Sequence, residues 1–257
     1  MKEKSPVPSL LRGIRVLETL ARDPYEMNLS ELSQQLSVPR ASLWRILKLL
    51  SDEEYIIFDR TRKAYRLGFK FMYMGSALLS GAHFKSQGRN LLRSLAERTG
   101  ETAEIDMRVR NQLVIVEQVP GPHAVYSYSY PGSVMPYFHA TAPGKVYLAE
   151  ITRNKLRAVM NKIGLPKLTQ HTIQELEQLE KEIEKIKIDG YAVDIEEMRE
   201  GVGRVAAPIY NKSKTIVACV AVVCPPFRLL DLNRRYEYGQ CVKEFASKMS
   251  EMNQQEN

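Results

Sequence analysis

The sequence predicts two domains: a helical amino-terminal domain with a β-hairpin, and an α+β domain with a mostly antiparallel sheet. Three observations lead to this prediction. The chain has 257 residues, which is long for one domain and sufficient for two. Residues 1–68 show three short amphipathic helical patterns and then two β-type segments. Beyond residue 82, β-type segments are interspersed with amphipathic helices, and beyond residue 100 cationic and acidic residues balance.

The charge is unevenly distributed along the chain. The composition is that of an ordinary globular protein, with 44% hydrophobic and 26% charged residues and a net charge of +7. Residues 1–100 contain 17 Lys and Arg against 10 Asp and Glu, whereas residues 101–257 contain 20 cationic and 20 acidic residues. A basic first part fits a domain that binds a polyanion, because neutralising phosphates requires surplus cations. A solubilising surface charge explains the same numbers equally well.

The sequence contains no pattern for export, membrane insertion or a disulfide framework. Residues 1–9 lack the apolar segment of a secretory signal, and the longest apolar run, 216–224, is far shorter than the ~20 residues of a membrane-spanning helix. The three cysteines form no CxxC pair and have no histidine at ligand spacing. We therefore expect a soluble cytoplasmic protein with reduced thiols, no structural metal and no cofactor.

The first three helices are predicted from the spacing of apolar residues. The first follows a cap at Ser9 and places four apolar side chains on one face, Leu10, Ile14, Leu17 and Leu20. The second covers 30–36 and the third covers 40–50, joined by residues 37–39. Two short helices joined by a three-residue turn form a helix-turn-helix.

The third helix is the expected recognition helix. Its inner face is apolar and consists of Leu43, Ile46, Leu47 and Leu50. The first turn and the opposite face carry the side chains expected to read or position DNA, Arg40, Ala41, Ser42, Trp44, Arg45 and Lys48. In helix-turn-helix proteins the start of the second helix enters the major groove, where Arg reaches guanine edges and Ser bonds to phosphates or bases. A solvated surface helix would show a similar pattern.

A hairpin with a basic tip follows this helix and favours DNA binding. Residues 53–58 and 64–67 are β-type, and the turn between them carries Arg60, Arg62 and Lys63. Three helices followed by a hairpin form a winged helix-turn-helix, whose wing lies on the phosphate backbone or in the minor groove. We assign residues 1–68 to this domain and residues 69–81 to a connecting helix.

The second domain, 82–257, is expected to combine helices and strands around one sheet. Helical patterns cover 82–99, 145–150, 154–163, 173–188 and 228–252. The β-type segments cover 103–110, 113–119, 124–130, 190–194, 202–210 and 215–224. Because the last of these is almost entirely apolar, it should be a central strand.

Several segments resemble one known family. Residues 29–32 (LSEL), 38–47 (VPRASLWRIL) and 65–68 (YRLG) look like the DNA-binding domain of the IclR family of bacterial transcriptional regulators. Residues 136–149 (PYFHATAPGKVYLA) and 190–209 (GYAVDIEEMREGVGRVAAPI) resemble the two signatures of that family's effector-binding domain, whose fold is related to GAF domains. The resemblance covers about residues 9–250. It implies a repressor or activator that binds a double-stranded DNA operator as a homodimer or a dimer of dimers.

The resemblance also implies an effector pocket. Its residues would be Val125, Tyr128, Ala142, Pro143, Gly144, Asp194, Val202, Arg204, Ala221 and Val223, with Pro136 in the apolar wall. Arg204 stands where many members have Cys, and Ala221 and Val223 stand where members that bind very small keto acids have serines. Losing two hydroxyls makes the wall more apolar, and a guanidinium offers a bidentate partner for a carboxylate. We therefore expect a small organic carboxylate effector with an apolar or aromatic body. Alternatively, Arg204 is an internal salt-bridge residue.

The alternative function is that of a small-acid enzyme or of a metabolite-binding protein that does not bind DNA. Residues 139–145 lack the first glycine and the Ser or Thr of a phosphate-binding loop, and the chain has no GxSxG motif. His139, Asp194 and Glu196 lack metal-ligand spacing. Amides at the helix start after Gly144 could still hold a small anion. The sequence therefore predicts a regulator that is not an enzyme, and it leaves the operator, the effector and the sign of regulation open.

Overall fold

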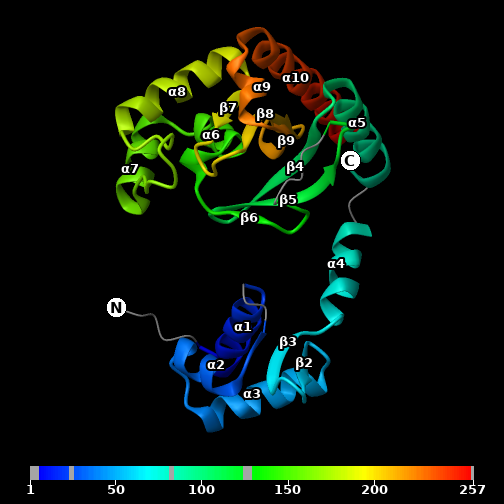
Figure 1. The fold of residues 1–257 in the computed structure, drawn as a ribbon, viewed down its shortest axis with the longest axis vertical. Helices are drawn as coiled ribbons and strands as arrows, with labels where there is room; N and C mark the ends of the chain where they lie inside the picture. The colour runs from blue at the N-terminus through cyan, green and yellow to red at the C-terminus, as the bar shows by residue number, and fades with distance from the viewer. Residues whose placement is uncertain (1–5, 23–25, 81–83, 124–128, 256–257) are drawn as a thin grey trace. The chain divides into compact units, whose positions relative to one another are not determined.

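The computed structural model describes residues 6–22, 26–80, 84–123 and 129–255. The chain divides into two compact units, residues 1–82 and 83–257, and each is described by itself (Figure 1). The predicted connecting segment 69–81 contains helix α4 (Lys70–Ser80). Among the described residues, no helix combines the length and the apolar character needed to span a membrane.

The first unit consists of helices and a small antiparallel sheet. Besides α4, its elements are α1 (Pro8–Leu20), β1 (Glu26–Met27), α2 (Leu29–Leu36), α3 (Arg40–Asp52), β2 (Ile56–Asp59) and β3 (Ala64–Leu67). The hairpin β2–β3 is the predicted wing, and β1, which the sequence does not predict, pairs with β3. A capping box between Asn28 and Glu31 starts α2. Helix α1 begins at Pro8 rather than after the predicted cap Ser9, because proline suits the first turn of a helix.

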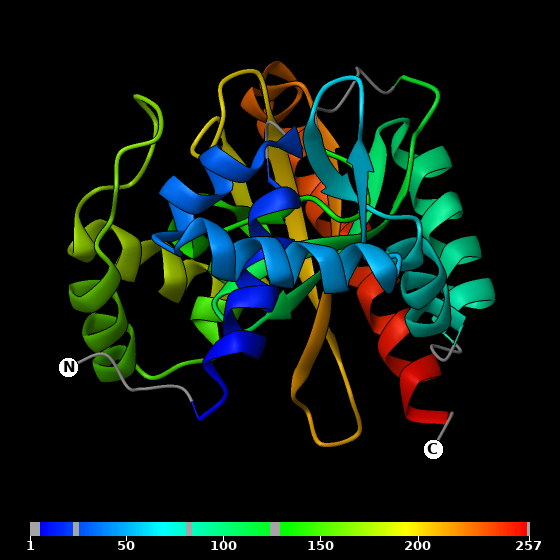
Figure 2. The same cartoon turned by 90° about the horizontal axis from the view of Figure 1, so that it is seen from below.

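The predicted inner face of α1 is wrong in part. Leu10 and Ile14 are 61% and 44% exposed, whereas Gly13 and Leu20 are buried. The small Gly13 faces α3, where an added Cβ would lie 3.8 Å from the nearest methyl group of Ile46. The buried face of α1 therefore includes a glycine that a search for apolar side chains passes over. Figure 2 shows α3 crossing α1 in this unit.

The second unit is built on a six-stranded sheet in the order β6-β5-β4-β9-β8-β7, with every described pairing antiparallel. Its strands are β4 (Thr102–Val109), β5 (Gln112–Val119), β6 (Val134–Met135), β7 (Ala192–Ile195), β8 (Gly203–Tyr210) and β9 (Ile216–Cys224). Its helices are α5 (Phe84–Thr99), α6 (Ala142–Ala149), α7 (Arg153–Ile163), α8 (Leu176–Asp189), α9 (Pro226–Leu230) and α10 (Leu232–Gln255). The apolar strand β9 lies inside the sheet, as predicted, and the α+β class of this domain is confirmed.

Helices cover both faces of this sheet. Helices α5 and α10 pack against one face, and α6, α7 and α8 lie on the other (Figure 1). Because side chains alternate along each strand, β5, β8 and β9 contribute apolar residues to both cores, whereas β4 contributes Ala103 and Ile105 only to the core under α5 and α10. The face covered by α6, which we call the α6 face, also carries the buried charged side chains described below.

Some predicted elements differ from the structure. The expected helix over 228–252 is two helices, because Asp231 interrupts it and its carboxylate accepts hydrogen bonds from the amides of Asn233 and Arg234. The amphipathic pattern from Ile173 starts ahead of α8, and Ile173 is buried within the preceding loop. The strand β6 was not predicted. Most of the predicted strand 124–130 lies outside the described residues.

Candidate functional site

The predicted recognition residues lie on the outer side of α3. Five of them are exposed and Ser42 is half-buried, the exposed ones being Arg40, Ala41, Trp44, Arg45 and Lys48. On the inner side, Leu43 and Leu47 are completely buried. Trp44 is 51% exposed, and the ammonium group of Lys48 lies 5.7 Å from the centre of its ring. An exposed tryptophan among cations suits a surface that contacts another molecule.

The wing presents its basic residues to solvent. Asp59 accepts hydrogen bonds from the amides of Thr61 and Arg62 at 2.8 and 3.0 Å and so closes the turn. Arg60, Arg62 and Lys63 are all exposed. The guanidinium of Arg62 is paired with Glu26 of β1 at 2.8 Å. Within the described part of the chain, the other two cations have no carboxylate partner.

In the second unit, four of the predicted pocket residues share the α6 face. Arg204 on β8 lies between Asp194 on β7 and Val223 on β9. Ala221 on β9 lies beside Glu104 on β4. Since alternate residues of a strand project to the same face, all five side chains lie on the α6 side. Asp194 and Glu104 are completely buried and Arg204 is 4% exposed.

Arg204 is held between two acids of the chain. Its Nε donates to Oε1 of Glu104 at 3.2 Å, and its Nη1 lies 3.9 Å from Oδ2 of Asp194. The guanidinium reaches across β9, where Val223 lies opposite Arg204 and the small Ala221 lies opposite Glu104. Burial opposes the charge, but the two carboxylates raise the pKa of Arg204 above its usual value. This geometry is the internal salt bridge that the sequence left open as an alternative.

The amide groups at the start of α6 are also engaged by the chain itself. Oδ2 of Asp194 accepts a hydrogen bond from the amide of Ala142 at 2.9 Å. Oγ1 of Thr141 accepts one from the amide of Gly144 at 3.1 Å, and Pro143 has no amide hydrogen. Gly144 is required here because a Cβ would lie 2.3 Å from a backbone oxygen. The amides predicted to hold an anion therefore already have acceptors.

Buried carboxylate oxygens on the α6 face lack hydrogen-bond donors. Asp106, two residues after Glu104 on β4, is completely buried, and neither of its oxygens has a partner among the described residues. The same holds for Oδ1 of Asp194. Burial, followed by the charge of Glu104, raises the pKa of Asp106 well above its usual value. Glu104 and Asp106 were not among the predicted site residues, although two acids at alternate positions of an apolar strand predict a shared face.

Lys145 forms a second buried ion pair next to this region. Its side chain is completely buried, and its Nζ lies 2.6 Å from Glu197 and 3.4 Å from Glu182. Burial raises the pKa of Glu197 to about 7, although the charge of Lys145 opposes this. The sequence analysis did not assign a role to this pair, since a lysine in a short helix is most often exposed.

The remaining predicted residues are not gathered into one site. Val125 and Tyr128 lie outside the described residues. Val202 is half-buried in the turn before β8, and Pro136 is exposed. The buried His139 lies with Nε2 3.3 Å from the carbonyl oxygen of Pro166, and burial lowers its pKa. The described residues contain no cluster of three side chains able to hold a metal ion.

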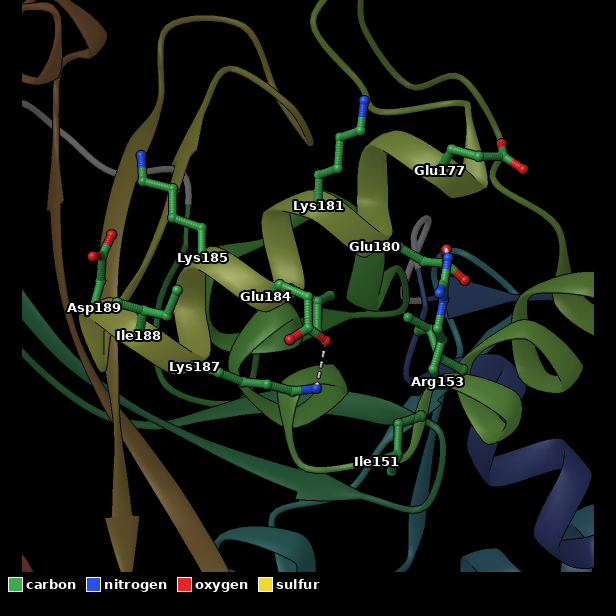
Figure 3. A pocket seen from close by; sticks show the side chains of 12 residues that line it. Ile151, Arg153, Glu177, Glu180, Lys181, Glu184, Lys185, Lys187, Ile188 and Asp189 are labelled. Atoms are coloured by element: carbon green, nitrogen blue, oxygen red, sulfur yellow. Dashed lines mark hydrogen bonds and ion pairs between the residues drawn. The ribbon is translucent and has the colours of Figure 1, made fainter.

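A separate open groove lies beside α8, where residues following α6 and the start of α7 form its other wall (Figure 3). Two ion pairs form among its charged residues: Arg153 with Glu180, and Lys187 with Glu184. None of the predicted effector residues lines this groove. It therefore differs from the predicted effector site in both position and chemistry.

Comparison with known proteins agrees with both halves of this description. The IclR helix-turn-helix domain matches residues 9–60, and the bacterial transcriptional regulator IclR C-terminal domain matches residues 76–251. The HTH-type transcriptional repressor AllR of Klebsiella pneumoniae is 28% identical over 242 residues, covering 94% of this chain and 88% of that protein. The HTH-type transcriptional regulator XynR of Escherichia coli K12 is 27% identical over 216 residues, covering 84% and 85%.

Solved structures share the same fold. An IclR transcriptional regulator from Alicyclobacillus acidocaldarius has a TM-score of 0.84 at 24% identity, covering 96% of this chain and 99% of that one. An IclR homologue from Microbacterium hydrocarbonoxydans, complexed with 4-hydroxybenzoate, has a TM-score of 0.77 at 18% identity, covering 95% and 98%. The curated relatives are regulators rather than enzymes, as predicted for this chain. The chain belongs to the IclR family of bacterial transcriptional regulators.

Proposed function

We propose that this regulator reads its operator with α3 in the major groove and the wing β2–β3 on the phosphate backbone. The observation that supports this most is the division of α3 into a buried apolar face and an exposed basic face. Among the described residues, Arg45 has no ion-pair partner, so its guanidinium is available to a guanine edge. Arg40, Ser42 and Trp44 surround it, and Arg60 and Lys63 supply phosphate contacts from the wing.

We propose that the operator is palindromic or nearly so and is bound by a homodimer, or by a dimer of dimers. Helix α1, the turn before α4 and α4 itself leave large apolar side chains exposed: Leu10, Ile14, Phe69 and Met72. Such side chains on a basic domain fit helix pairing with a second copy of the chain. A two-fold dimer places two recognition helices about one DNA turn apart, which matches palindromic half-sites.

We propose that the effector of this cytoplasmic regulator binds at the α6 face, beside Asp194 and Arg204. Binding there would shift the population between operator-competent and operator-incompetent assemblies, for repression or for activation. An organic carboxylate would compete with Glu104 for Arg204 and with Asp194 for the amide of Ala142. The carboxylate effector stays a prediction, and the unpartnered acids favour a different ligand chemistry.

Arg45→Ala tests the recognition helix. We expect about a tenfold or larger loss of operator affinity, because a bidentate Arg–guanine pair contributes about 1–3 kcal/mol. The measurement is a gel shift on a duplex that the wild-type protein enriches from a random-sequence library. Arg93→Ala removes the same charge from the exposed side of α5 and serves as the control. Equal affinity of the Arg45→Ala and wild-type proteins would contradict the assignment of α3.

A further inference from the structure

We propose that the effector site takes a small organic cation, an ammonium or amidinium compound, whose N–H groups bind Asp106 and Asp194. This inference rests on the proposed effector site and specifies its ligand. It starts from unequal numbers of buried charges on the α6 face. Three carboxylates, those of Glu104, Asp106 and Asp194, accompany a single guanidinium, that of Arg204.

The neighbouring lysine does not restore the balance. Lys145 is already bound to Glu197 at 2.6 Å and to Glu182 at 3.4 Å, so two other acids match its charge. Asp106 has neither a cation nor a hydrogen-bond donor in contact with it among the described residues, and Oδ1 of Asp194 also lacks a donor. Buried carboxylate oxygens are normally satisfied, so these atoms indicate where a donor-bearing ligand would bind.

An anionic ligand meets two obstacles at the same place. Of the donors that could hold a carboxylate, the Nε of Arg204 is engaged by Glu104 and the amide of Ala142 by Asp194, which leaves Nη1 of Arg204 without a hydrogen-bond acceptor among the described residues. When Asp106 is ionised, a ligand carboxylate would also add a fourth negative charge to a buried set with one cation. A cation reverses both effects, because it supplies N–H donors to Asp106 and reduces the excess of negative charge.

The proposal couples ligand binding to proton release. The titratable groups that face Asp106 are Glu104 on its own strand, Cys219 on β9, Arg204 on β8, Asp194 on β7 and Tyr147 on α6. Burial raises the pKa of Asp106. Without ligand, its carboxyl group therefore stays protonated at pH values above the usual range for aspartate. A bound cation favours the ionised form, so the proton leaves. Cation affinity should therefore rise with pH until the raised pKa is passed, and carboxylate affinity should fall over the same range.

Isothermal titration calorimetry of the full chain with shape-matched ligands tests the proposal. One set is benzamidine, benzamide and benzoate, and a smaller set is acetamidine, acetamide and acetate. We expect the amidinium of at least one set to bind about tenfold or more tightly than its carboxylate, as charge-assisted hydrogen bonds predict. Its affinity should rise as the pH rises above the usual carboxylate range, with proton release seen as a buffer-dependent heat. If neither amidinium binds, or if each carboxylate binds as tightly as its amidinium, the proposal is overturned.

Asp106→Asn links the result to one residue. This variant keeps the shape and removes the charge, so we expect about a tenfold loss of amidinium affinity with an equal or higher unfolding temperature. Unchanged binding with a lower unfolding temperature would mean a structural role and would overturn the proposal. Glu237→Gln, on the exposed side of α10, is the charge-matched control. If Asp106→Asn does not fold, the ligand preference of the wild type decides, because carboxylates that bind as tightly as their amidinium counterparts would still overturn the proposal.

Gel shifts on the same preparations separate this inference from the proposed function. If Arg45→Ala weakens operator binding but the protein prefers carboxylates to amidinium compounds, only the proposal of a cationic ligand is overturned. A wild-type protein that binds amidinium but shows no Arg45-dependent operator binding would instead contradict the DNA-binding proposal.

Discussion

Arg204 joins β4 and β7 through a nearly completely buried guanidinium. Its partners Glu104 and Asp194 are completely buried, so neither can turn to solvent if the cation is removed. Breaking a buried ion pair costs more than the pair contributes, because the remaining charge stays without compensation. In this chain three carboxylates would then face each other on the α6 side of the sheet.

Arg204→Ala is therefore expected to lower the free energy of unfolding by about 3–5 kcal/mol. Denaturant unfolding of the full chain measures this loss. Adding Glu104→Gln should recover part of it, since the second change removes one of the uncompensated charges. Arg93→Ala, an exposed substitution, should stay within about 0.5 kcal/mol of the wild type. An Arg204→Ala protein as stable as the wild type would show that the internal salt bridge does not support the fold.

At this scale the sequence predicted the site only in part. Asp194 and Arg204 were found through the family signature, and the structure places them together. Glu104 and Asp106 lie in a strand outside both signatures. Their position near Arg204 depends on the pairing of β4 with β9. That pairing joins residues more than a hundred positions apart, which local patterns do not encode.

Among the elements, the wing carries three exposed cations that differ in whether they have an ion-pair partner. Arg62 is tied to Glu26 on β1, whereas Arg60 and Lys63 have no carboxylate partner in the described parts of the chain. A cation that already has a partner gains less from a phosphate, because the existing pair must be broken first. Lys63 should therefore contribute more to DNA binding than Arg62.

Lys63→Ala should reduce the slope of log affinity against log salt by about one, as expected for the loss of one phosphate contact. Arg62→Ala should change the slope less. Fluorescence anisotropy with a labelled operator duplex, titrated at several salt concentrations, gives both slopes. A larger change for Arg62→Ala than for Lys63→Ala would mean that the Glu26 pair opens on DNA and that the wing contacts phosphate differently.

Periodicity predicted most helices and the long strands, and its failures have physical causes. The strands β1 and β6 contain two residues each, too few to show alternation. The inner face of α1 was misplaced because Gly13 contributes contact without an apolar side chain. The break between α9 and α10 depends on the capping carboxylate of Asp231, whose role is set by the local backbone.

For the whole molecule, the two-domain organisation was predicted from motifs and charge, and both family domains match it. The excess positive charge of the first hundred residues is divided between the units, because residues 1–82 contain 13 Lys and Arg against 9 Asp and Glu, and residues 83–100 contain 4 against 1. The buried acids of the α6 face lie in the second unit. Regulation requires that effector binding and operator binding share one equilibrium. Thermodynamic linkage then makes the effect reciprocal, with typical coupling of about 1–3 kcal/mol.

The most direct test of the account is the operator affinity of the full chain with and without a saturating amidinium, measured by fluorescence anisotropy. We predict a change of at least about fivefold for the wild type, in either direction, because repressors and activators respond with opposite signs. Asp106→Asn should need about tenfold more amidinium than the wild type for the same change in operator affinity. A wild-type affinity that stays constant while calorimetry shows the amidinium bound would contradict the claim that this site controls DNA binding.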